Sequence, residues 1–408
     1  MDFKDSPDEA AFRAEVRDFI AREVPPELRN ARRAAGSGFE LFAPEQQSAL
    51  DRWRRKLAER GWVAPAWPRE YGGGGMTAFQ QSIFHFEMAE ARVPAVPSGI
   101  GIGMAGPTII VHGDDEQKRA YLPGILSGEV LWCQLWSEPG SGSDLASLRT
   151  SAVRDGDSYV VNGQKIWTSA AQKAQMAILL ARTDPEAPKH RGITFFVVDM
   201  KTPGITVQPL VQIPGSERYQ QVLTGNAGFN QVFLDSVRVP AQNIVGGVDR
   251  GWYVNTTTLD FERSSIGSSV GTRHAVLDIA RFARESVRVG VSMLERNPLV
   301  RYELADRMVE AQTAVMLSLR VAHLQNRGLV PNHEASIIKL FSSELGQRVA
   351  RTEMKVVGLY GQLLGERAPQ GGRAAAAYAG SLSATIAGGT SEIQRNIIAQ
   401  RGLGLPRD

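Results

Sequence analysis

The 408-residue sequence predicts an α+β fold, because helical periodicity occupies both ends of the chain and strand-like runs occupy its middle. Near the start, the apolar residues Phe12, Val16 and Ile20 recur at helical spacing, and Pro25 stops the run. After Gly251 the helical period returns and continues almost to the end of the chain. No solenoid repeat is visible in the sequence.

The rest of the first part predicts more helices. Leu50, Trp53 and Leu57 repeat the apolar period, and Gly61 ends it. Further helices are expected over Phe79 to Ala91 and over Lys118 to Leu126. The glycine-rich run from Tyr71 to Gly75 predicts a flexible loop.

The middle of the chain predicts a β domain over residues 131–243. Two β-prone runs flank Asn162-Gly163 within Ser158 to Trp167, a pattern typical of a hairpin. A polar, glycine-containing stretch from Gly215 to Asn230 predicts a loop insertion. Further strands are expected over Met176 to Ala181, Ile193 to Val198 and Gln231 to Val239.

The last part predicts a helical domain over residues 244–408, and the first helical domain spans 1–130. Long helices are expected over 252–285, 302–323 and 334–358, followed by a loop from Ser381 that enters a final helix ending near Gln400. The apolar residues Leu304, Met308, Val315 and Leu319 form a face that we expect to need a partner chain.

The composition is that of an ordinary globular protein, with 43% hydrophobic and 22% charged residues. The net charge of +3 comes from Lys and Arg scattered among Asp and Glu, so no nucleic-acid surface is expected. The single cysteine, Cys133, excludes internal disulfides and fits a reducing compartment. With no signal peptide and no membrane span expected, we predict a cytoplasmic protein. The six histidines show no metal-ligand spacing.

The most informative stretch runs from Trp136 to Asp144 and contains Ser137-Glu138-Pro139-Gly140-Ser141-Gly142-Ser143. Its glycines and proline predict a tight turn whose backbone can approach a ligand closely. About two dozen residues later, Lys165-Ile166-Trp167-Thr168-Ser169 places a large aromatic beside two hydroxyls on an expected strand. Together these segments indicate a surface for a flat, polar, aromatic cofactor.

This pair of segments resembles the flavin-contacting segments of the acyl-CoA dehydrogenase family, and the resemblance extends over nearly the whole chain. It implies an N-terminal helical domain, a middle β-barrel domain and a C-terminal four-helix bundle. The implied activity is FAD-dependent α,β-dehydrogenation of an acyl-CoA, with electrons passed to an electron-transferring flavoprotein. The implied assembly is a homotetramer or an α2β2 heterotetramer.

The resemblance also assigns flavin contacts. The hydroxyl of Ser137 would bond the isoalloxazine, while Trp167 and Ser169 would flank the ring near N5. Gly142, Ser143 and nearby backbone groups would lie at the flavin and substrate end. Taken alone, a glycine-rich turn is common and a strand tryptophan is more often a core residue, so the assignment depends on the two segments occurring together.

The catalytic base departs from the commonest family pattern. Most members carry a glutamate where this chain has Gly388, in Gly388-Gly389-Thr390. A minority branch, similar to isovaleryl- and long-chain acyl-CoA dehydrogenases, has the base in a Leu-Asp-x-Glu-Arg motif, which here is Leu259-Asp260-Phe261-Glu262-Arg263. The resemblance therefore implies that Glu262 is the base, that Arg263 supports the entrance, and that the Gly388 backbone N–H stabilises the enolate. The alternative is an ordinary helical glutamate paired with a neighbour.

Contacts to the FAD diphosphate and adenine are matched less closely. Arg288 takes the place of the family's usual arginine, and Thr390 and Glu392 match positions that approach FAD from the other side. The glycine-rich segment also departs, reading Gly358-Leu359-Tyr360-Gly361. Two alternatives therefore stay open: a partner subunit of a heteromeric dehydrogenase, and a flavin-dependent oxidase or monooxygenase on the same fold. The glycines at 99, 101, 103 and 388 hint at room for a bulky acyl group.

Overall fold

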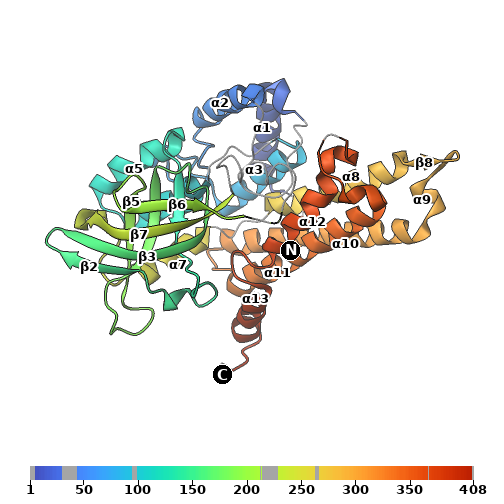
Figure 1. Cartoon of the computed structure of the whole chain (residues 1–408). Helices are drawn as coiled ribbons and strands as arrows, with labels where there is room; N and C mark the ends of the chain where they lie inside the picture. Colours follow the sequence, from blue (N-terminus) through green and yellow to red (C-terminus); the bar gives the residue numbers. More distant parts are fainter. Residues whose placement is uncertain are drawn as a thin grey trace. The chain divides into compact units, whose positions relative to one another are not determined.

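The computed structural model describes residues 5–29, 44–93, 99–211, 213, 228–261, 266–365 and 367–406. The chain divides into two compact units. The first unit comprises Met1–Glu59, Gly75–Val96 and Ser264–Asp408, and the second comprises Arg60–Gly74 and Pro97–Arg263. The first is helical and the second contains the sheet, which confirms the α+β class (Figure 1). The boundaries predicted at 131 and 244 stay predictions.

The first unit begins with the helices expected from the apolar period. Helix α1 (Pro7–Glu23) starts at a capping box, in which the Ser6 hydroxyl and the Glu9 carboxylate each accept the other's backbone N–H. Helices α2 (Pro44–Ala58) and α3 (Ala78–Glu90) follow, and Thr77 with Gln80 caps α3 in the same way. These elements confirm the predicted helices in this part of the chain.

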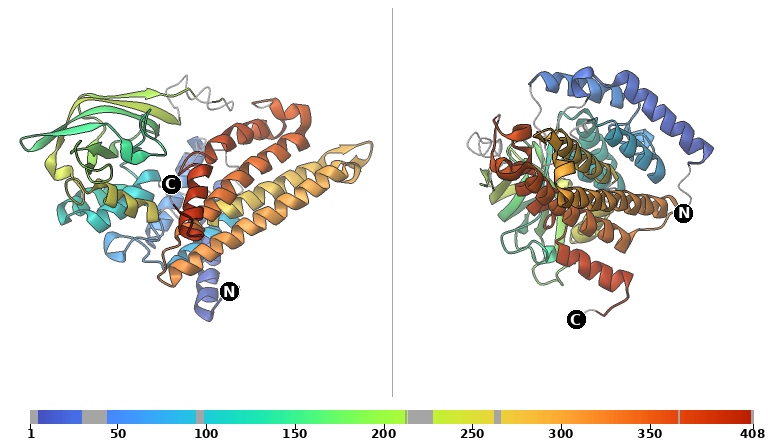
Figure 2. Two further views of the ribbon diagram at one scale, coloured as in Figure 1. Left: turned by 90° about the horizontal axis from the view of Figure 1, so that it is seen from below. Right: turned by 90° about the vertical axis from the view of Figure 1, so that its right-hand side faces the viewer.

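The long C-terminal helices of this unit pack side by side as a bundle, and the two longest run together in Figure 2. Their apolar faces share one core that includes Val276, Leu304, Ala314 and Leu345. The helices are α8 (Ile266–Glu285), α10 (Pro298–Asn326), α11 (Asn332–Val357) and α12 (Arg373–Ala384), with the short α9 (Met293–Arg296) and a β8–β9 hairpin (Val287–Arg288, Val291–Ser292) between α8 and α10.

Two expectations for this part need correction, and a third is only partly covered by the described residues. The predicted loop from Ser381 is shorter than expected, because α12 continues to Ala384 and α13 (Ser391–Ile397) begins soon after. The helical residues expected over 252–285 are found in α7 (Gly251–Phe261) and α8, and residues 262–265 between them lie outside the described residues. Leu304 and Val315 do not need a partner chain to cover them, because both are already buried in the bundle of their own chain.

The second unit is built on a curled seven-stranded sheet with a core that includes Leu135, Val161, Phe196 and Val237 (Figure 1). The strand order is β1-β4-β2-β3-β7-β6, and β5 pairs with β4. The strands are β1 (Trp132–Leu135), β2 (Ser151–Asp155), β3 (Ser158–Ser169), β4 (Met176–Arg182), β5 (Ile193–Asp199), β6 (Ile205–Pro209) and β7 (Phe229–Pro240). Three of the predicted strands are thus confirmed, while most of the predicted insertion at 215–230 lies outside the described residues.

The hairpin predicted at Asn162-Gly163 is wrong. Strand β3 runs straight through these residues, and the turn lies earlier, where Asp155 pairs with Ser158 around Gly156. Asn162 instead accepts the Ser236 N–H through its Oδ1 at 2.8 Å, beside a shift in the β3–β7 register. The asparagine thus caps a bulge rather than forming a turn.

The glycine loop after Tyr71 is closely packed rather than loose. The N–H of Gly73 donates to Pro68 O and that of Gly74 to Ala64 O, each at 3.1 Å. A Cβ on Gly73 would lie 2.2 Å from the Trp67 carbonyl oxygen, so the position requires glycine. Trp67 in turn donates its Nε1–H to Ile102 in the π-helix η3 (Gly101–Ala105), which precedes α4 (Gly106–His112) and α5 (Asp115–Ser127).

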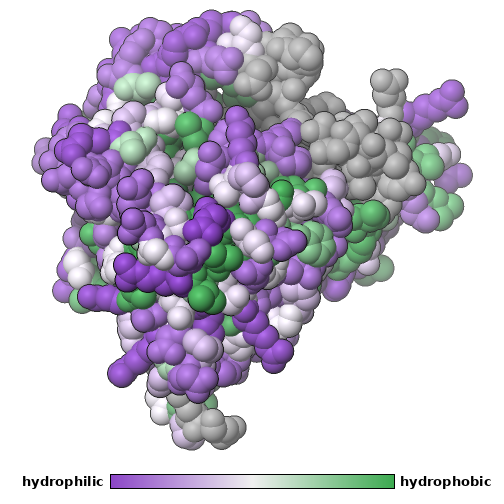
Figure 3. All heavy atoms as spheres, turned by 60° about the vertical axis from the view of Figure 1, so that its left-hand side comes forward, coloured by the Kyte–Doolittle hydropathy of each residue, from purple (hydrophilic) through white to green (hydrophobic). Residues whose placement is uncertain are grey.

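The face of the molecule in Figure 3 is largely hydrophilic, with hydrophobic residues interspersed, as the scattered charges predict. In the described part of the chain, no helix is long and apolar enough to cross a membrane. No cluster of three or more His, Cys, Asp or Glu suited to a metal ion occurs among those residues. Cys133 is buried in the sheet core.

Replacing Gly163 with alanine should destabilise the second unit. The new Cβ would lie 2.4 Å from Thr150 Oγ1 and 2.8 Å from Thr150 Cα, and overpacking of this kind costs about 1–3 kcal/mol. Gly103→Ala is the control, because no atom lies within 4 Å of a Cβ added there. Urea unfolding should give a lower midpoint for Gly163→Ala only, and equal midpoints for the two variants would contradict this packing.

Candidate functional site

The two segments singled out in the sequence lie side by side in the second unit. The Ile166 N–H donates to the Ser137 carbonyl oxygen at 2.9 Å, which joins β3 to the turn that follows β1. The turn closes on itself, because Glu138 and Ser141 exchange two backbone hydrogen bonds of 2.9 and 3.0 Å. The predicted tight turn is therefore confirmed, and it is attached to the strand that carries Trp167 and Ser169.

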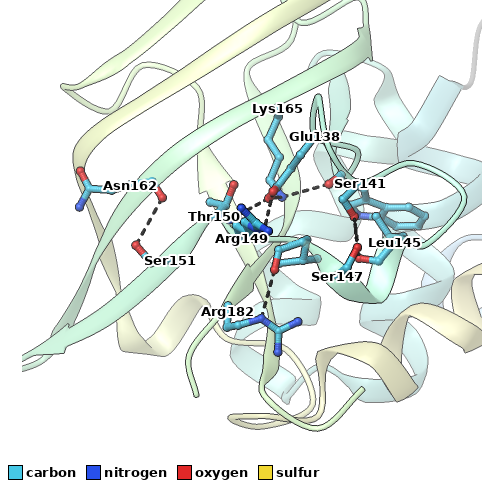
Figure 4. Close-up of polar contacts among 12 residues, drawn as sticks. Glu138, Ser141, Leu145, Ser147, Arg149, Thr150, Ser151, Asn162, Lys165 and Arg182 are labelled. Carbon is cyan, nitrogen blue, oxygen red and sulfur yellow. Dashed lines mark hydrogen bonds and ion pairs between the residues drawn. The ribbon is translucent and has the colours of Figure 1, made fainter. Parts of the chain in front are cut away.

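A buried ion pair lies at this junction (Figure 4). The Lys165 ammonium is 2.9 Å from Glu138 Oε1, and the side chains of Lys165 and Glu138 are 0% and 9% exposed. Glu138 also accepts the backbone N–H groups of Arg149 at 2.7 Å and Thr150 at 2.8 Å. Burial alone would raise the pKa of Glu138, but Lys165 and these hydrogen bonds outweigh it, so the pKa lies below its ordinary value and the carboxylate stays charged.

Trp167 occupies an unusual backbone conformation just beyond this pair. Its φ is +61°, and the β3–β7 pairing shifts register between Lys165 and Thr168. The indole is 59% exposed and meets Phe229 edge to face, with ring centroids 6.2 Å apart. Such left-handed residues cluster where function requires a strained backbone, so the bulge marks a candidate binding surface.

The surroundings of Trp167 fit a planar polar ring. Trp167 is exposed, and a Cβ added at Gly140 or Gly142 would meet no atom within 4 Å. Ser143 is exposed in the same turn, and Ser137 and Ser169 are partly exposed. Among the described residues, the buried Thr168 hydroxyl has no hydrogen-bond partner. An isoalloxazine, with an aromatic face and a polar edge, suits this combination.

In the first unit, the Gly388 segment is held by two side chains. Gly388 and Gly389 have φ values of +65° and +88°, so both favour glycine. The Lys339 ammonium from α11 donates to Gly389 O, and Gln394 Nε2 donates to Gly388 O at 3.0 Å. These two bonds fix the peptide planes that carry the N–H groups of Gly389 and Thr390, and so hold the backbone directly after Gly388 in place.

The same segment borders a polar cavity of about 510 Å³. Thr390 and Glu392 line it together with Arg348, Arg351 and Arg395. The Thr390 hydroxyl caps α13 by accepting the Ile393 N–H at 3.2 Å. Glu344 and Glu392 also line the cavity, and Arg348 and Arg395 form ion pairs with Glu310 and Glu344. The three guanidinium groups still exceed the two lining carboxylates, and this excess of positive charge suits an anionic group such as a diphosphate. Arg288 does not line this cavity and lies exposed in the β8–β9 hairpin.

Glu392 is exposed, and its pKa lies below its ordinary value because its own backbone N–H and the Thr390 hydroxyl stabilise the charged form. A lowered pKa makes a weaker base, which agrees with the expectation that Glu392 does not replace the missing carboxylate at 388.

Glu262 and Arg263 lie outside the described residues, directly after α7. The start of that helix is anchored firmly to the sheet. A Cβ on Gly251 would lie 2.5 Å from the Phe195 backbone nitrogen, so the first turn lies directly against β5. Asp249 donates its N–H to Thr194 Oγ1 at 2.8 Å and accepts the Thr183 hydroxyl at 2.5 Å.

The sequence interpretation missed Lys165, Glu138, Lys339 and Gln394. One signal was available for Lys165, which falls on the inward-facing alternation of β3 set by Tyr159 and Val161. A lysine at a core position of a strand needs a buried partner of opposite charge. No comparable signal was available for Lys339, because its partner is a backbone carbonyl 50 residues away.

The sequence matches three family models: the acyl-CoA dehydrogenase N-terminal domain over residues 6–129, the middle domain over 133–231 and the C-terminal domain over 249–403. The acyl-CoA dehydrogenase IpdE1 of Mycobacterium tuberculosis is 35% identical over 97% of this chain and 98% of its own length. FadE34 of the same organism is 40% identical over 90% of this chain, and the match spans only 48% of FadE34.

Solved structures agree with these matches. The Tcur3481–Tcur3483 steroid ACAD has a TM-score of 0.83 and 30% identity, with both chains covered completely. The ChsE4–ChsE5 complex of Mycobacterium tuberculosis has a TM-score of 0.80 and 34% identity, again with complete coverage. The chain belongs to the acyl-CoA dehydrogenase family of FAD-dependent oxidoreductases.

Proposed function

We propose that this protein removes the α and β hydrogens of an acyl-CoA thioester to give the trans-2-enoyl-CoA. The observation that carries the proposal is the exposed, strained Trp167 beside the Ser137 turn, which fits a flavin ring. Bound FAD would accept the β-hydride at its N5 position. Ser137, Gly142, Ser143, Trp167 and Ser169 would bind and orient the ring.

The chain's own residues would handle the proton and the developing charge. Glu262 takes the α-proton, and its basicity rises when substrate excludes water from the carboxylate. The backbone N–H of Gly388 donates to the thioester oxygen, with Lys339 and Gln394 keeping the segment in place. Among the described residues, a Cβ at Gly388 would meet only Lys339 Cε, at 4.0 Å. Arg263 supports the entrance.

For the rest of the FAD, Thr390 and the neighbouring arginines would hold the diphosphate, and Glu392 would approach the cofactor from the same side. Arg288 is proposed to contact the FAD of a neighbouring subunit. Electrons would then pass to an electron-transferring flavoprotein.

A bulky acyl group is the favoured substrate. The similarity to a steroid ACAD supports it. Anaerobic titration with a panel of acyl-CoAs tests the function directly, since a substrate should bleach the flavin absorbance. If no straight, branched or polycyclic acyl-CoA bleached it, with or without a partner chain, the proposal would be wrong.

Two alternatives make different predictions. In a partner subunit with an incomplete FAD site, the amount of bound flavin would fall well below one per chain. The similarity to the ChsE4–ChsE5 complex supports considering this alternative. In an oxidase or monooxygenase, reduced flavin would reoxidise rapidly in O₂. A base at Glu262 argues against the monooxygenase, which needs no α-proton removal.

The purified protein should contain FAD and not FMN. The polar cavity at Thr390 and Glu392 suits a diphosphate, which FMN lacks. Chromatography of the flavin released by denaturation identifies the cofactor. Release of FMN, or a flavin-free protein after co-expression with its partners, would contradict this prediction.

The protein should not be monomeric, and a dimer of dimers is expected. Large apolar side chains remain exposed on α10 and after α11, with Leu299 78%, Tyr302 67%, Val309 67% and Leu359 84% exposed. Exposed apolar surface of this kind usually marks an interface. Light scattering measures the mass, and a stable monomer that retains FAD would contradict the prediction.

Glu262→Gln should lower the rate of flavin reduction by roughly 10²–10⁴-fold, because the amide keeps the shape of the side chain but cannot accept the proton. FAD content and thermal stability should be almost unchanged. Stopped-flow measurement of flavin reduction checks the rate. A variant that reduces its flavin at the wild-type rate would exclude Glu262 as the base.

Gly388→Glu in the Glu262→Gln background is the matched rescue. If both positions address the same substrate carbon, part of the flavin reduction should return. The rescue should be incomplete, since a φ of +65° costs an L-residue about 1–2 kcal/mol. Gly388→Gln in the same background is the control and should restore nothing.

A further inference from the structure

Lys165 is a charged residue at a core position of the sheet. Its side chain is fully buried within β3, between residues that face the apolar core. Lysine is almost never fully buried unless it is paired, because removing its charge from water is costly. Packing alone does not explain why a charged side chain is buried at residue 165, so its contacts must account for it.

The hydrogen bonds of the Lys165 side chain lie at the junction of the two candidate flavin segments (Figure 4). Its ammonium donates to Trp136 O at 3.0 Å and to Glu138 Oε1 at 2.9 Å. The next residue, Ile166, donates its N–H to Ser137 O at 2.9 Å. Three consecutive residues of the turn are therefore each bonded to Lys165 or to its neighbour.

Glu138 extends the same connection to the residues that precede β2. Its two carboxylate oxygens accept the backbone N–H groups of Arg149 and Thr150, directly before β2 begins at Ser151. One carboxylate thus links the turn, the start of β2 and the strand that carries Trp167. A neutral side chain could not serve the ammonium and both N–H groups equally well.

The bulge begins directly after this anchor. The β3–β7 pairing is regular at Lys165 and resumes at Thr168, and between them Trp167 adopts a φ of +61°. Residues in this conformation persist only when the surrounding structure holds them there. Without an anchor at 165, a one-residue slip would relieve the strain and move Trp167 to the opposite face.

We infer that Glu138 and Lys165 are positioning residues of the flavin site, whose buried ion pair fixes the Ser137 turn against the bulge that presents Trp167 and Ser169. This inference rests on the proposed function, because the ligand positioned is the isoalloxazine. Neither residue needs to touch the cofactor. The ion pair instead affects the affinity for FAD and the environment of the bound isoalloxazine ring.

The test compares Lys165→Met, Glu138→Gln and the double variant carrying both changes. Arg238→Met is the control, since Arg238 forms an ion pair with Asp155 at 2.8 Å in the same sheet but both side chains are 60% exposed. For each protein we would measure FAD affinity by reconstituting the apoprotein, the visible spectrum of the bound flavin, and the thermal midpoint.

Each single variant should bind FAD about 10–100-fold more weakly, as expected from the loss of a charged hydrogen bond, and shift the flavin spectrum. The double variant should recover thermal stability, because no buried charge is left unpaired. It should not recover FAD affinity or the wild-type spectrum, since nothing then ties the turn to the bulge. Arg238→Met should match the wild type throughout.

Two results would overturn the inference while leaving the proposed function intact. In the first, the wild type binds FAD and Lys165→Met binds it equally well with the same spectrum. In the second, the double variant recovers stability, affinity and spectrum together, which would make the pair purely structural. A wild-type protein that binds no FAD under any condition would overturn both proposals.

Discussion

The candidate flavin site depends on one buried ion pair, between Glu138 and Lys165. Two charges at 0% and 9% exposure are costly to bury, and removing one partner of such a pair typically costs about 3–5 kcal/mol. Evolution could have replaced both with apolar residues at little cost in stability. Because the ion pair adds little to stability, its presence is better explained by the local structure that it fixes. Here it joins the Ser137 turn to the bulge at Trp167.

The Gly388 segment shows the same principle in the first unit. Losing the side chain at 388 removes a carboxylate but leaves the backbone N–H available. Lys339 and Gln394 occupy the carbonyls of Gly388 and Gly389, so the segment stays ordered without any side chain of its own. The departure from the commonest family pattern therefore alters the position of the proposed base without dismantling the proposed oxyanion donor.

The sequence predicted the elements whose periodicity is strong and local, and failed where long-range contacts decide. The helix at Val16 follows from the helical period, and the strand at Phe196 follows from a short, continuous run of apolar, β-prone residues. Asn162-Gly163 was misread as a hairpin because its role depends on Ser236, 74 residues away. The glycine run after Tyr71 suggests flexibility from sequence, whereas in the structure Gly73 is required by its close approach to Trp67. Ser137 and Trp167 are identified through the family resemblance. The only sequence signal for Lys165, which links them, is a charged residue at an inward-facing strand position.

The most direct measurement is a high-resolution crystal structure of the FAD-bound protein. The account predicts an isoalloxazine ring between the Ser137 turn and the Trp167 indole, a left-handed Trp167, and Lys165 Nζ within hydrogen-bond distance of both Glu138 and the Trp136 carbonyl. A flavin bound away from Trp167, or a Trp167 relaxed into regular strand geometry with the ion pair broken, would contradict it.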